Sequence, residues 1–590
     1  MNYLLITLGH NSSAIFVDND QIDKKPVVIG YEQERFSKLK ADSQFPIDAI
    51  NEIIYNVGLK KLKQSKCLVS HWFNFNDGNM PNKYISYSDM MFLKDLTSQV
   101  EFVNNEFTHH DAHMMSAYTF YKYSIGNNDN YETPLHCLVI DGFGNNEEVI
   151  SLYCRLNNDD KPKLIKRIYG YNYSLGLMYQ YATSFVGMKE NQDEYKFLGY
   201  EAHIDEYFNE NCISAISQKS DELIEKVFKP AIFINDGAST IPTSAAVGID
   251  FNRAKLNTVK SMWYSYFSDV LQCLRYHSES IEHTESFEAR VAIAFYIQRT
   301  IEKVISLICV AYNIKNLCCA GGLFYNVKLN NHILNVISGN LCVMPLAGDQ
   351  GAAIGMYANE PNTPQFPFDT LSIGPRRLYN IEKLIKNIPN AKILNESANS
   401  TYYEIAEEIA NGNIVNIVFG NMEFGPRALC STSTLFLPTE RNTSRNNANN
   451  KRNEVMPCAP VCTDKNAKLL FNNYELDRII GSTKFMICTC EYEKPYSKSY
   501  SGVMHKITLH DNSYSGRPQI ISDSDNFYEE RMYLLLGFVE RITDYKCIVN
   551  TSFNAHGQPI VFDTADIIRN FMIQYENAKT GEKPKLYILI

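Results

Sequence analysis

The sequence predicts an α/β protein built from two domains. Its 590 residues are too many for a single hydrophobic core. Apolar segments of strand length alternate with amphipathic helices and glycine turns as far as Asn359. A proline-rich break, residues 359–368, follows, and regular patterning resumes after Gly374-Pro375. We therefore expect one domain over residues 1–360 and a second over residues 371–590.

The composition is that of a globular protein. Hydrophobic residues make up 45% and charged residues 21% of the chain, which excludes a largely disordered, collagen-like or coiled-coil protein. The net charge of −10 provides no overall attraction to nucleic acid or to an anionic membrane. The cysteines are scattered without the spacing of a disulfide framework or of paired zinc knuckles, so we expect reduced thiols in the core.

The N-terminal sequence predicts neither export nor membrane insertion. Residues 1–9 lack the basic start and the cleavage site of a signal peptide and run directly into a polar motif. No apolar run reaches the ~20 residues of a membrane span. We expect a cytoplasmic protein without a membrane partner.

Strand and helix patterns follow one another in a recognisable order. Residues 3–8, 14–17 and 27–31 read as a β-meander, and residues 135–140 as a buried strand ending at Asp141-Gly142. A helical face then leads into the strand before Gly321-Gly322; it comprises Ile297, Ile301, Val304, Ile305 and Ile308. Residues 341–345 form the next strand, before Gly348-Asp349-Gln350-Gly351 and a helix of small residues. This order is typical of an α/β nucleotide-binding core. The asparagine-rich residues 442–453 read as a solvated loop.

Two histidines and two aspartates form a candidate metal site. His109 and His113, four residues apart, share one face of a predicted helix and can point at the same cation. Asp141 and Asp349 follow strand ends and would complete a mixed nitrogen and oxygen set, which suits iron, manganese or zinc better than magnesium. The alternative is that the histidines pack or cap and that the aspartates serve turns.

His10 and the glycine turns are candidates for contacts with substrates. His10 follows the first strand, where it could act as general base towards a hydroxyl, although Asn11 and Ser12 could equally form a plain turn. Gly321 and Gly322 with Asn326, and Gly351 in the second turn, predict close backbone approach to nucleotide phosphates.

The second domain contains a candidate anion site. Arg427 lies on a Gly-Pro turn, and a guanidinium is well suited to phosphate oxygens. Arg452, Arg517 and Lys40 could add to the site, although a surface position is the more usual one for such residues. A polar cluster after the strand ending at Val549 could join them or form an ordinary turn; it contains Asn550, Ser552 and Asn554.

A series of motifs in fixed order along nearly the whole chain resembles the carbamoyltransferase family of the nodulation-factor, cephamycin, novobiocin and tobramycin enzymes. The motifs are Gly9 to Ser13, Tyr31 to Phe36, His109/His113, Asp141-Gly142, Ser174-Leu175-Gly176 with Tyr179, Glu194-Tyr195-Lys196 with Leu198-Gly199, Gly321-Gly322 with Asn326, Asp349-Gln350-Gly351, Glu423 to Leu429 and Asn550 to Asn554.

The resemblance implies a Kae1-like N-terminal domain of the actin/Hsp70-like (ASKHA) superfold and a YrdC-like C-terminal domain. The second would activate carbamoyl phosphate with ATP and magnesium to carbamoyl-adenylate, and the first would pass the carbamoyl group to a hydroxyl. By this resemblance iron(II), or another divalent ion such as manganese or zinc, binds at the metal site; His10 lies beside the acceptor, and carbamoyl phosphate is held by Lys40, Arg427 and Arg452.

This sequence departs from the family pattern near the anion site. Asn11 replaces the usual aspartate, Thr432 replaces an arginine, and the arginine-rich stretch has become residues 452–460, with Asn453 and Met456 among the changes. Either neighbouring cations compensate, or donor activation differs; the neighbours are Arg441, Arg445 and Lys451.

The acceptor is left open as a small molecule, a sugar, or a hydroxymethylpyrimidine in a nucleotide or in DNA, and so is formation of a homodimer. DNA binding would require a local basic cleft and would weaken steeply with salt. Two other functions are considered: a modifier of the tRNA threonylcarbamoyladenosine type, which the fused domain order disfavours, and a nucleotide-binding regulatory protein with a decayed second site.

Overall fold

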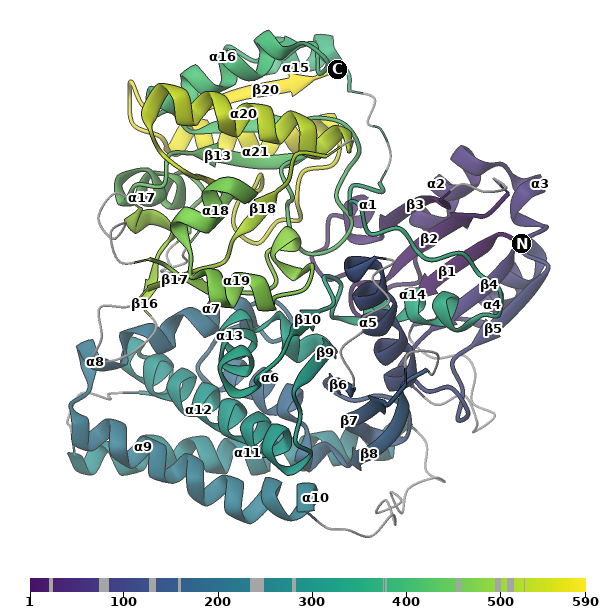
Figure 1. Ribbon diagram of the computed structural model, residues 1–590, viewed down its shortest axis with the longest axis vertical. Coiled ribbons are helices and arrows are strands. Elements are labelled where there is room, and N and C mark those ends of the chain that lie inside the picture. The colour runs from purple at the N-terminus through teal and green to yellow at the C-terminus, as the bar shows by residue number, and fades with distance from the viewer. Residues whose placement is uncertain are drawn as a thin grey trace.

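The chain forms a mixed α/β structure with three main sheets (Figure 1). The computed structural model describes residues 1–20, 25–73, 84–126, 134–157, 161–233, 249–277, 283–374, 376, 379–452, 458–493, 500–506, 514–524 and 526–590. Among these residues, no helix has both the length and the apolar character that a membrane crossing needs. The predicted α/β class is confirmed.

The first sheet has the order β3-β2-β1-β4-β5. Its first three strands form the predicted antiparallel meander, and β4 and β5 run parallel to β1. The bounds are Tyr3–Thr7 (β1), Ser13–Asp18 (β2), Val27–Glu32 (β3), Lys66–Ser70 (β4) and Gln99–Phe102 (β5).

The second sheet repeats this arrangement in the order β10-β9-β6-β7-β8. Its first three strands in sequence are again antiparallel, and the two later ones run parallel to the first. The bounds are Leu135–Ile140 (β6), Glu148–Arg155 (β7), Lys163–Tyr169 (β8), Asn316–Ala320 (β9) and Leu341–Val343 (β10). Two sheets of one topology are characteristic of actin/Hsp70-like proteins, so this expectation for the N-terminal part is confirmed.

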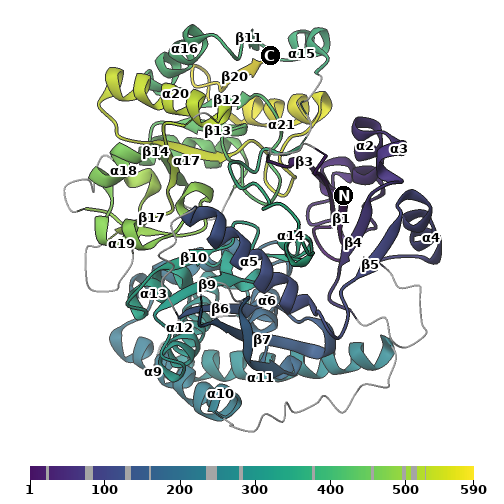
Figure 2. The same cartoon turned by 45° about the vertical axis from the view of Figure 1, so that its right-hand side comes forward.

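Two helices lie between these sheets and bring the candidate site together (Figure 2). They are α5 (His109–Ile125) and α14 (Asp349–Asn359), and their backbones touch at Gly355. A β-carbon at Gly355 would lie 1.8 Å from the carbonyl oxygen of Ala112, so only glycine permits this approach. Residues from both helix N-termini can therefore meet.

Helices cover the outer face of the second sheet. They bury a large apolar core that includes Trp263 and Phe267. One of them, α12, contains the predicted face from Ile297 to Ile308. The bounds are Leu175–Phe185 (α6), Glu194–Tyr200 (α7), Glu210–Leu223 (α9), Ile249–His277 (α11), Phe287–Ala311 (α12) and Val327–Val336 (α13).

The third sheet belongs to the C-terminal part and has seven strands in the order β11-β20-β12-β13-β19-β14-β18. The bounds are Lys392–Leu394 (β11), Val415–Val418 (β12), Thr432–Phe436 (β13), Ala459–Thr463 (β14), Gln519–Ile521 (β18), Ile548–Ser552 (β19) and Lys585–Leu589 (β20). Adjacent residues Ile417 and Val418 enter different apolar clusters, so both faces of the sheet are covered. The covering helices are α15 (Ile381–Asn387), α16 (Asn399–Ala410), α20 (Phe527–Thr543) and α21 (Thr564–Asn577).

The segment between the two parts is packed against both. The N–H of Gly30 in β3 donates to the Ile373 carbonyl, and the N–H of Phe424 donates to the Leu371 carbonyl, at 2.9 and 2.7 Å. Phe366 and Phe368 are buried in the core beside α5 and α14. The division at residues 360 and 371 stays a prediction, and the connection is an ordered part of the core.

The prediction of a solvated loop at residues 442–453 is wrong for residues 442–450; residues 451 and 452 follow the helix in non-helical backbone, and residue 453 lies outside the described residues. Helix α17 (Glu440–Asn449) occupies most of this stretch, and three of its asparagines are buried. Asn450, just beyond the helix, accepts a hydrogen bond from Gln574, whose oxygen accepts one from Asn416. Buried amides that pair with one another replace the water that the composition suggested.

The cysteines form no disulfide bonds, as predicted. All fifteen are free thiols, and all except Cys154 and Cys273 are buried. They contribute to the cores as small apolar side chains.

Candidate active site

The N-terminus of α5 places the two predicted histidine ligands together. Thr108 caps the helix and exchanges hydrogen bonds with Asp111 in a capping box. One helical turn then sets His109 and His113 side by side, both fully buried, with their Nε2 atoms 3.1 Å apart. The predicted helix and the shared face are confirmed.

Two carboxylates from other elements face this pair. Asp141 follows β6 and lies with Oδ2 3.4 Å from Nε2 of His109; Asp349 begins α14 and lies with Oδ1 3.3 Å from the same nitrogen. Asp349 Oδ1 is also 3.6 Å from Nε2 of His113. The four potential ligand atoms all lie within 4.8 Å of one another.

The four side chains fit a divalent cation. Burial opposes a positive charge on His109, but Asp141 and Asp349 outweigh it and raise the pKa of this imidazole to about 10. Positive charge is thus stabilised at the centre of the cluster. One buried oxygen of Asp349, Oδ2, has no hydrogen-bond partner within the described structure. Two imidazoles with two carboxylates suit iron, manganese or zinc.

The glycine turns lie against the segments that carry Asp141 and Asp349, and only some of their residues line the cavity. Gly321 has φ +103°, and a β-carbon there would lie 2.2 Å from the Ile140 carbonyl oxygen. The N–H of Gly322 donates to Oδ1 of Asp141 at 2.9 Å. Gly351 packs on the Leu346 carbonyl, and Asn326 caps α13. Asn326 and Gly322 line the cavity described next, whereas Gly321 and Gly351 do not, and nucleotide contacts of all four stay predictions.

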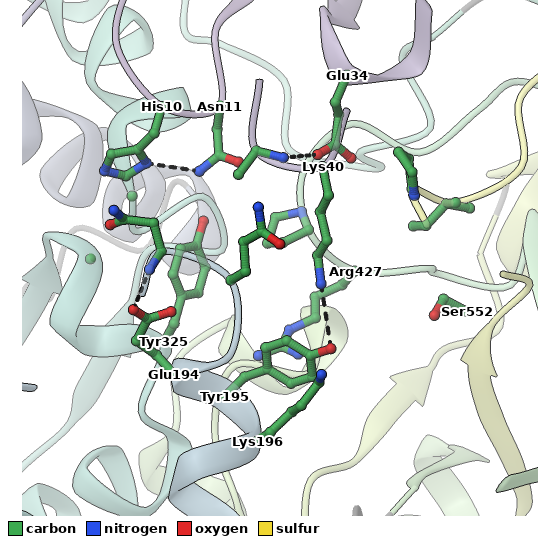
Figure 3. Close-up of a pocket in the computed structure, with 18 of the residues that line it drawn as sticks. His10, Asn11, Glu34, Lys40, Glu194, Tyr195, Lys196, Tyr325, Arg427 and Ser552 are labelled. Atoms are coloured by element: carbon green, nitrogen blue, oxygen red, sulfur yellow. Dashed lines mark hydrogen bonds between the residues drawn. The ribbon is translucent and has the colours of Figure 1, made fainter. Parts of the chain in front are cut away.

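One cavity of about 410 Å³ extends from this cluster to the C-terminal part. His10 stands at its N-terminal side, with Nε2 4.0 Å from Oδ2 of Asp349. Figure 3 shows the Lys40 side chain pointing towards Tyr195 and Arg427, with Ser552 on another side of the cavity. The remaining predicted residues of the C-terminal part also line it: Arg452, Arg517, Asn550 and Asn554.

Four cations in this cavity, called the anion wall below, are Lys40, Arg427, Arg452 and Arg517. Within the described parts of the chain, none of them forms an ion pair with a carboxylate. Lys40 lies over the Tyr195 ring at 4.6 Å. Arg452 donates to Thr551 Oγ1 and Asn554 Oδ1, both at 3.2 Å. Among the described residues, the wall therefore presents positive charge with no carboxylate at ion-pair distance.

Burial makes two members of the anion wall receptive to an anion. It lowers the pKa of Arg427, and the buried Nε of this residue has no partner among the described atoms. Burial and the charge of Arg427 together hold the pKa of Arg517 well below its ordinary value. A bound phosphate would relieve both effects.

Comparison with known proteins decides the family. Residues 91–358 match the family "Carbamoyltransferase N-terminus", and residues 406–578 match "Carbamoyltransferase C-terminus". The chain belongs to the carbamoyltransferase family. It is accordingly an enzyme that transfers carbamoyl groups, as the resemblance implied.

Several relatives are similar over different lengths. An uncharacterized protein of Methanocaldococcus jannaschii is 26% identical, over 96% of this chain and 95% of its own. The nodulation protein NolNO of Sinorhizobium fredii is 24% identical, over 96% of this chain and 77% of its own. The 3'-hydroxymethylcephem-O-carbamoyltransferase of Amycolatopsis lactamdurans is 27% identical, over 28% of this chain and 29% of its own.

The departures of this carbamoyltransferase from its family pattern can now be placed. Thr432 begins β13 and is buried, with its N–H bonded to Glu423. Arg441 and Arg445 pair with Glu582, and neither lines the cavity, which argues against the alternative that these two compensate. Lys451 does not line it either. Asn453 and Met456 lie outside the described residues.

Sequence reasoning missed how the arginine turn of this carbamoyltransferase is held. Oε1 of buried Glu423 accepts hydrogen bonds from the N–H groups of Leu429, Ser431 and Thr432 at 3.0, 2.8 and 2.8 Å. Asn550 donates to the Ala428 carbonyl at 2.9 Å. The only local signal was the glutamate at the start of the Glu423 to Leu429 motif.

A second missed group supports the histidine helix. Buried Glu148 accepts from the N–H of His110 at 2.9 Å and from Thr108 Oγ1 at 3.1 Å. Arg167 pairs with Glu148 and with Asp111 at 3.1 and 2.7 Å. Glu148 lies 38 residues after His110, and Arg167 lies 56 residues after Asp111, so no local spacing pattern indicates these contacts.

Proposed function

We propose that this carbamoyltransferase is ATP-dependent and moves the carbamoyl group of carbamoyl phosphate, through carbamoyl-adenylate, to a hydroxyl group. The observation that carries the proposal is the single cavity that joins the four-residue ligand cluster to the anion wall. Such a reaction requires stabilisation of negative charge on the carbamoyl carbonyl and binding of phosphate groups. The four-residue ligand cluster would supply the first through a bound cation, and the anion wall would supply the second.

The anion wall would serve the activation half of the reaction. Carbamoyl phosphate, ATP and water give carbamoyl-adenylate, orthophosphate and pyrophosphate. The carbamoyl–phosphate bond is hydrolysed, and the resulting carbamate oxygen displaces pyrophosphate from the α-phosphorus of ATP. Arg427 and Arg517 would neutralise the phosphate oxygens, and Lys40 would bring a further charge from the N-terminal part.

The transfer half would use His10. The acceptor oxygen attacks the carbamoyl carbon, AMP departs with the electrons of its bond to that carbon, and the hydroxyl proton passes to Nε2 of His10. Nδ2 of Asn11 lies 3.1 Å from Nδ1 of His10. For Nε2 to act as the base, Nδ1 has to carry the ring proton, and this would require the Asn11 amide to be turned so that its oxygen accepts that proton.

His109, His113, Asp141 and Asp349 would hold the metal, for which we propose iron(II), with manganese or zinc as alternatives and magnesium accompanying ATP. When bound, the ion supplies Lewis-acid stabilisation of negative charge on the carbamoyl oxygen. The four side chains themselves hold their ligand atoms within 4.8 Å of one another at this end of the cavity.

For the acceptor we propose a hydroxymethyl or sugar hydroxyl. The name of the cephem relative describes transfer to a hydroxymethyl group. Small molecules, sugars and hydroxymethylpyrimidine nucleotides or DNA are all within this class. The net charge of −10 favours a small acceptor over DNA.

Pyrophosphate release tests the proposal. Purified protein with iron(II), ATP and magnesium should release pyrophosphate only when carbamoyl phosphate is added. Mass spectrometry of candidate acceptors should then show the carbamoyl mass increment. Absence of pyrophosphate with every acceptor would refute ATP dependence, and modification of a tRNA adenosine that requires threonine would assign the enzyme to the threonylcarbamoyladenosine type.

A further inference from the structure

Three charged residues lie where the two parts of the chain meet. Glu32 ends β3, and Glu34 and Arg35 begin the short helix α1 (Glu34–Ser37). Their exposed fractions are only 3%, 9% and 3%. Arg35 pairs with Glu32 at 2.6 Å and with Glu34 at 2.8 Å. We call Glu32, Glu34 and Arg35 the junction triad.

The junction triad forms hydrogen bonds with the turn that carries Arg427. Nη2 of Arg35 donates to the carbonyl of Gly425 at 3.0 Å, and the N–H of Gly425 donates to Oε2 of Glu32 at 3.2 Å. Both polar backbone groups of Gly425 are thereby held from the N-terminal part. Gly425 has φ +101°, and Arg427 follows two residues later. The position of Arg427 thus depends on residues of the N-terminal part. Arg35 and Gly425 are 390 residues apart in the sequence.

The same triad contacts the segments of two other site residues. Nε2 of Gln350, adjacent to Asp349, donates to Oε1 of Glu32 at 3.4 Å. The N–H of Ala41, adjacent to Lys40, donates to Oε2 of Glu34 at 2.8 Å. One buried unit therefore touches the chain beside a candidate metal ligand and beside two members of the anion wall.

We propose that the junction triad is a positioning unit that fixes the spacing between the four-residue ligand cluster and the anion wall. A buried ion network is a weak source of stability because each charge must be desolvated. Its directional contacts instead specify geometry, and a displacement of about 1 Å is enough to impair a reacting pair. The inference rests on the proposed function only in that both ends of the cavity bind their ligands.

The test measures that spacing directly in the full chain. Manganese(II) at the ligand cluster should enhance the phosphorus-31 relaxation of inorganic phosphate bound at the anion wall, and this enhancement falls steeply with distance. Arg35→Lys and Glu32→Gln keep size but break the contacts with Gly425 or Gln350. We expect the enhancement to change at least about twofold in both variants, while each ligand alone binds within about threefold of wild type.

Arg478→Lys is the matched control. Buried Arg478 also joins the two parts, donating to the carbonyls of Leu334, Ile337 and Gly339 at 2.6 to 2.9 Å, but it does not line the cavity. It should lower the melting temperature without changing the relaxation. If Arg35→Lys and Glu32→Gln do not fold, Glu34→Gln leaves the Gly425 contacts intact and alters the contact with the Lys40 segment, so it should change the relaxation while phosphate still binds within about threefold of wild type.

The outcomes separate this inference from the proposed function. Normal binding of both ligands with unchanged relaxation in the folded triad variants overturns the positioning role alone. An equal change in Arg478→Lys would show that any loosened contact between the parts has this effect, and it would also overturn the role. Failure of wild type to bind manganese(II) or phosphate would overturn the inference and the proposed function together.

Discussion

The Nε2 atoms of His109 and His113 lie 3.1 Å apart and both face Oδ1 of Asp349. Two ring nitrogens at this separation can share one proton but cannot both carry one without repulsion. The cluster is therefore built around a common point, and loss of any member should remove a ligand rather than a packing contact.

His109→Ala and Asp349→Asn should each abolish stoichiometric binding of iron(II) or manganese(II) and reduce carbamoyl transfer at least about 100-fold. Metal content after dialysis and calorimetric titration would measure this. His332→Asn is the control, because His332 forms a hydrogen bond with Ser306 of α12 and does not line the cavity. Wild-type transfer rates in a metal-depleted double variant would contradict the assignment.

Arg427→Gln should weaken carbamoyl phosphate binding by about 10- to 100-fold, because hydrogen bonds to charged groups contribute about 1.5–3 kcal/mol. The loss should appear as a raised KM or Kd at unchanged melting temperature. Arg441→Gln, an exposed arginine paired with Glu582, should leave the affinity unchanged. Equal effects of the two substitutions would argue for a general charge effect instead of a defined anion site.

Glu423→Ala should lower both stability and donor affinity. Its Oε1 accepts three backbone N–H groups of the turn that carries Arg427, and a buried donor left unpaired costs about 1–3 kcal/mol. Thermal melting and calorimetry with carbamoyl phosphate measure the two effects. Glu475→Ala removes a buried carboxylate that accepts from the N–H of Glu491, remote from the cavity, and should lower stability only.

Stability should depend on pH through Glu302. Burial and, second, Glu201 raise the pKa of Glu302 from 4.5 to about 7. Between these values the folded chain holds a proton that the unfolded chain has released, so the free energy of unfolding falls as pH rises from about 4.5 to about 7. In Glu302→Gln this loss is absent, and the hydrogen bond from Gln298 can be kept.

The melting temperature of Glu302→Gln relative to wild type should therefore increase with pH and level off above about 7, by about 2–4 °C. Melting curves at intervals between pH 5 and pH 8 would measure it. A constant difference across this range would contradict the raised pKa.

The sequence predicted those parts of the site that a local pattern encodes. The spacing of His109 and His113 requires only helical geometry, and Asp141 and Asp349 were recognisable because each follows an apolar strand. The actin/Hsp70-like superfold of the N-terminal part was implied by the family resemblance. Patterns of this kind reflect neighbours within one or two elements.

The contacts that hold the site in place had no such pattern. Glu148 reaches His110, and Arg35 reaches Gly425, only once distant segments have folded together. Helix α17, which has one buried face, was misread because asparagine usually pairs with water, whereas here Asn446 and Asn450 lie in a network of amides. Composition reports the average environment of a residue type and cannot reveal partners that tertiary structure supplies.

The contribution of Lys40 to a wall that otherwise comes from the C-terminal part has a consequence for how such proteins can change. If the C-terminal part were exchanged between relatives, it would bring its own arginines. It would then face a lysine and glutamates from a different protein where the two parts meet. We therefore expect the effects of substitutions on the two sides of this contact to depend on one another. The two parts have separate sheets, but the anion wall is complete only when both are present.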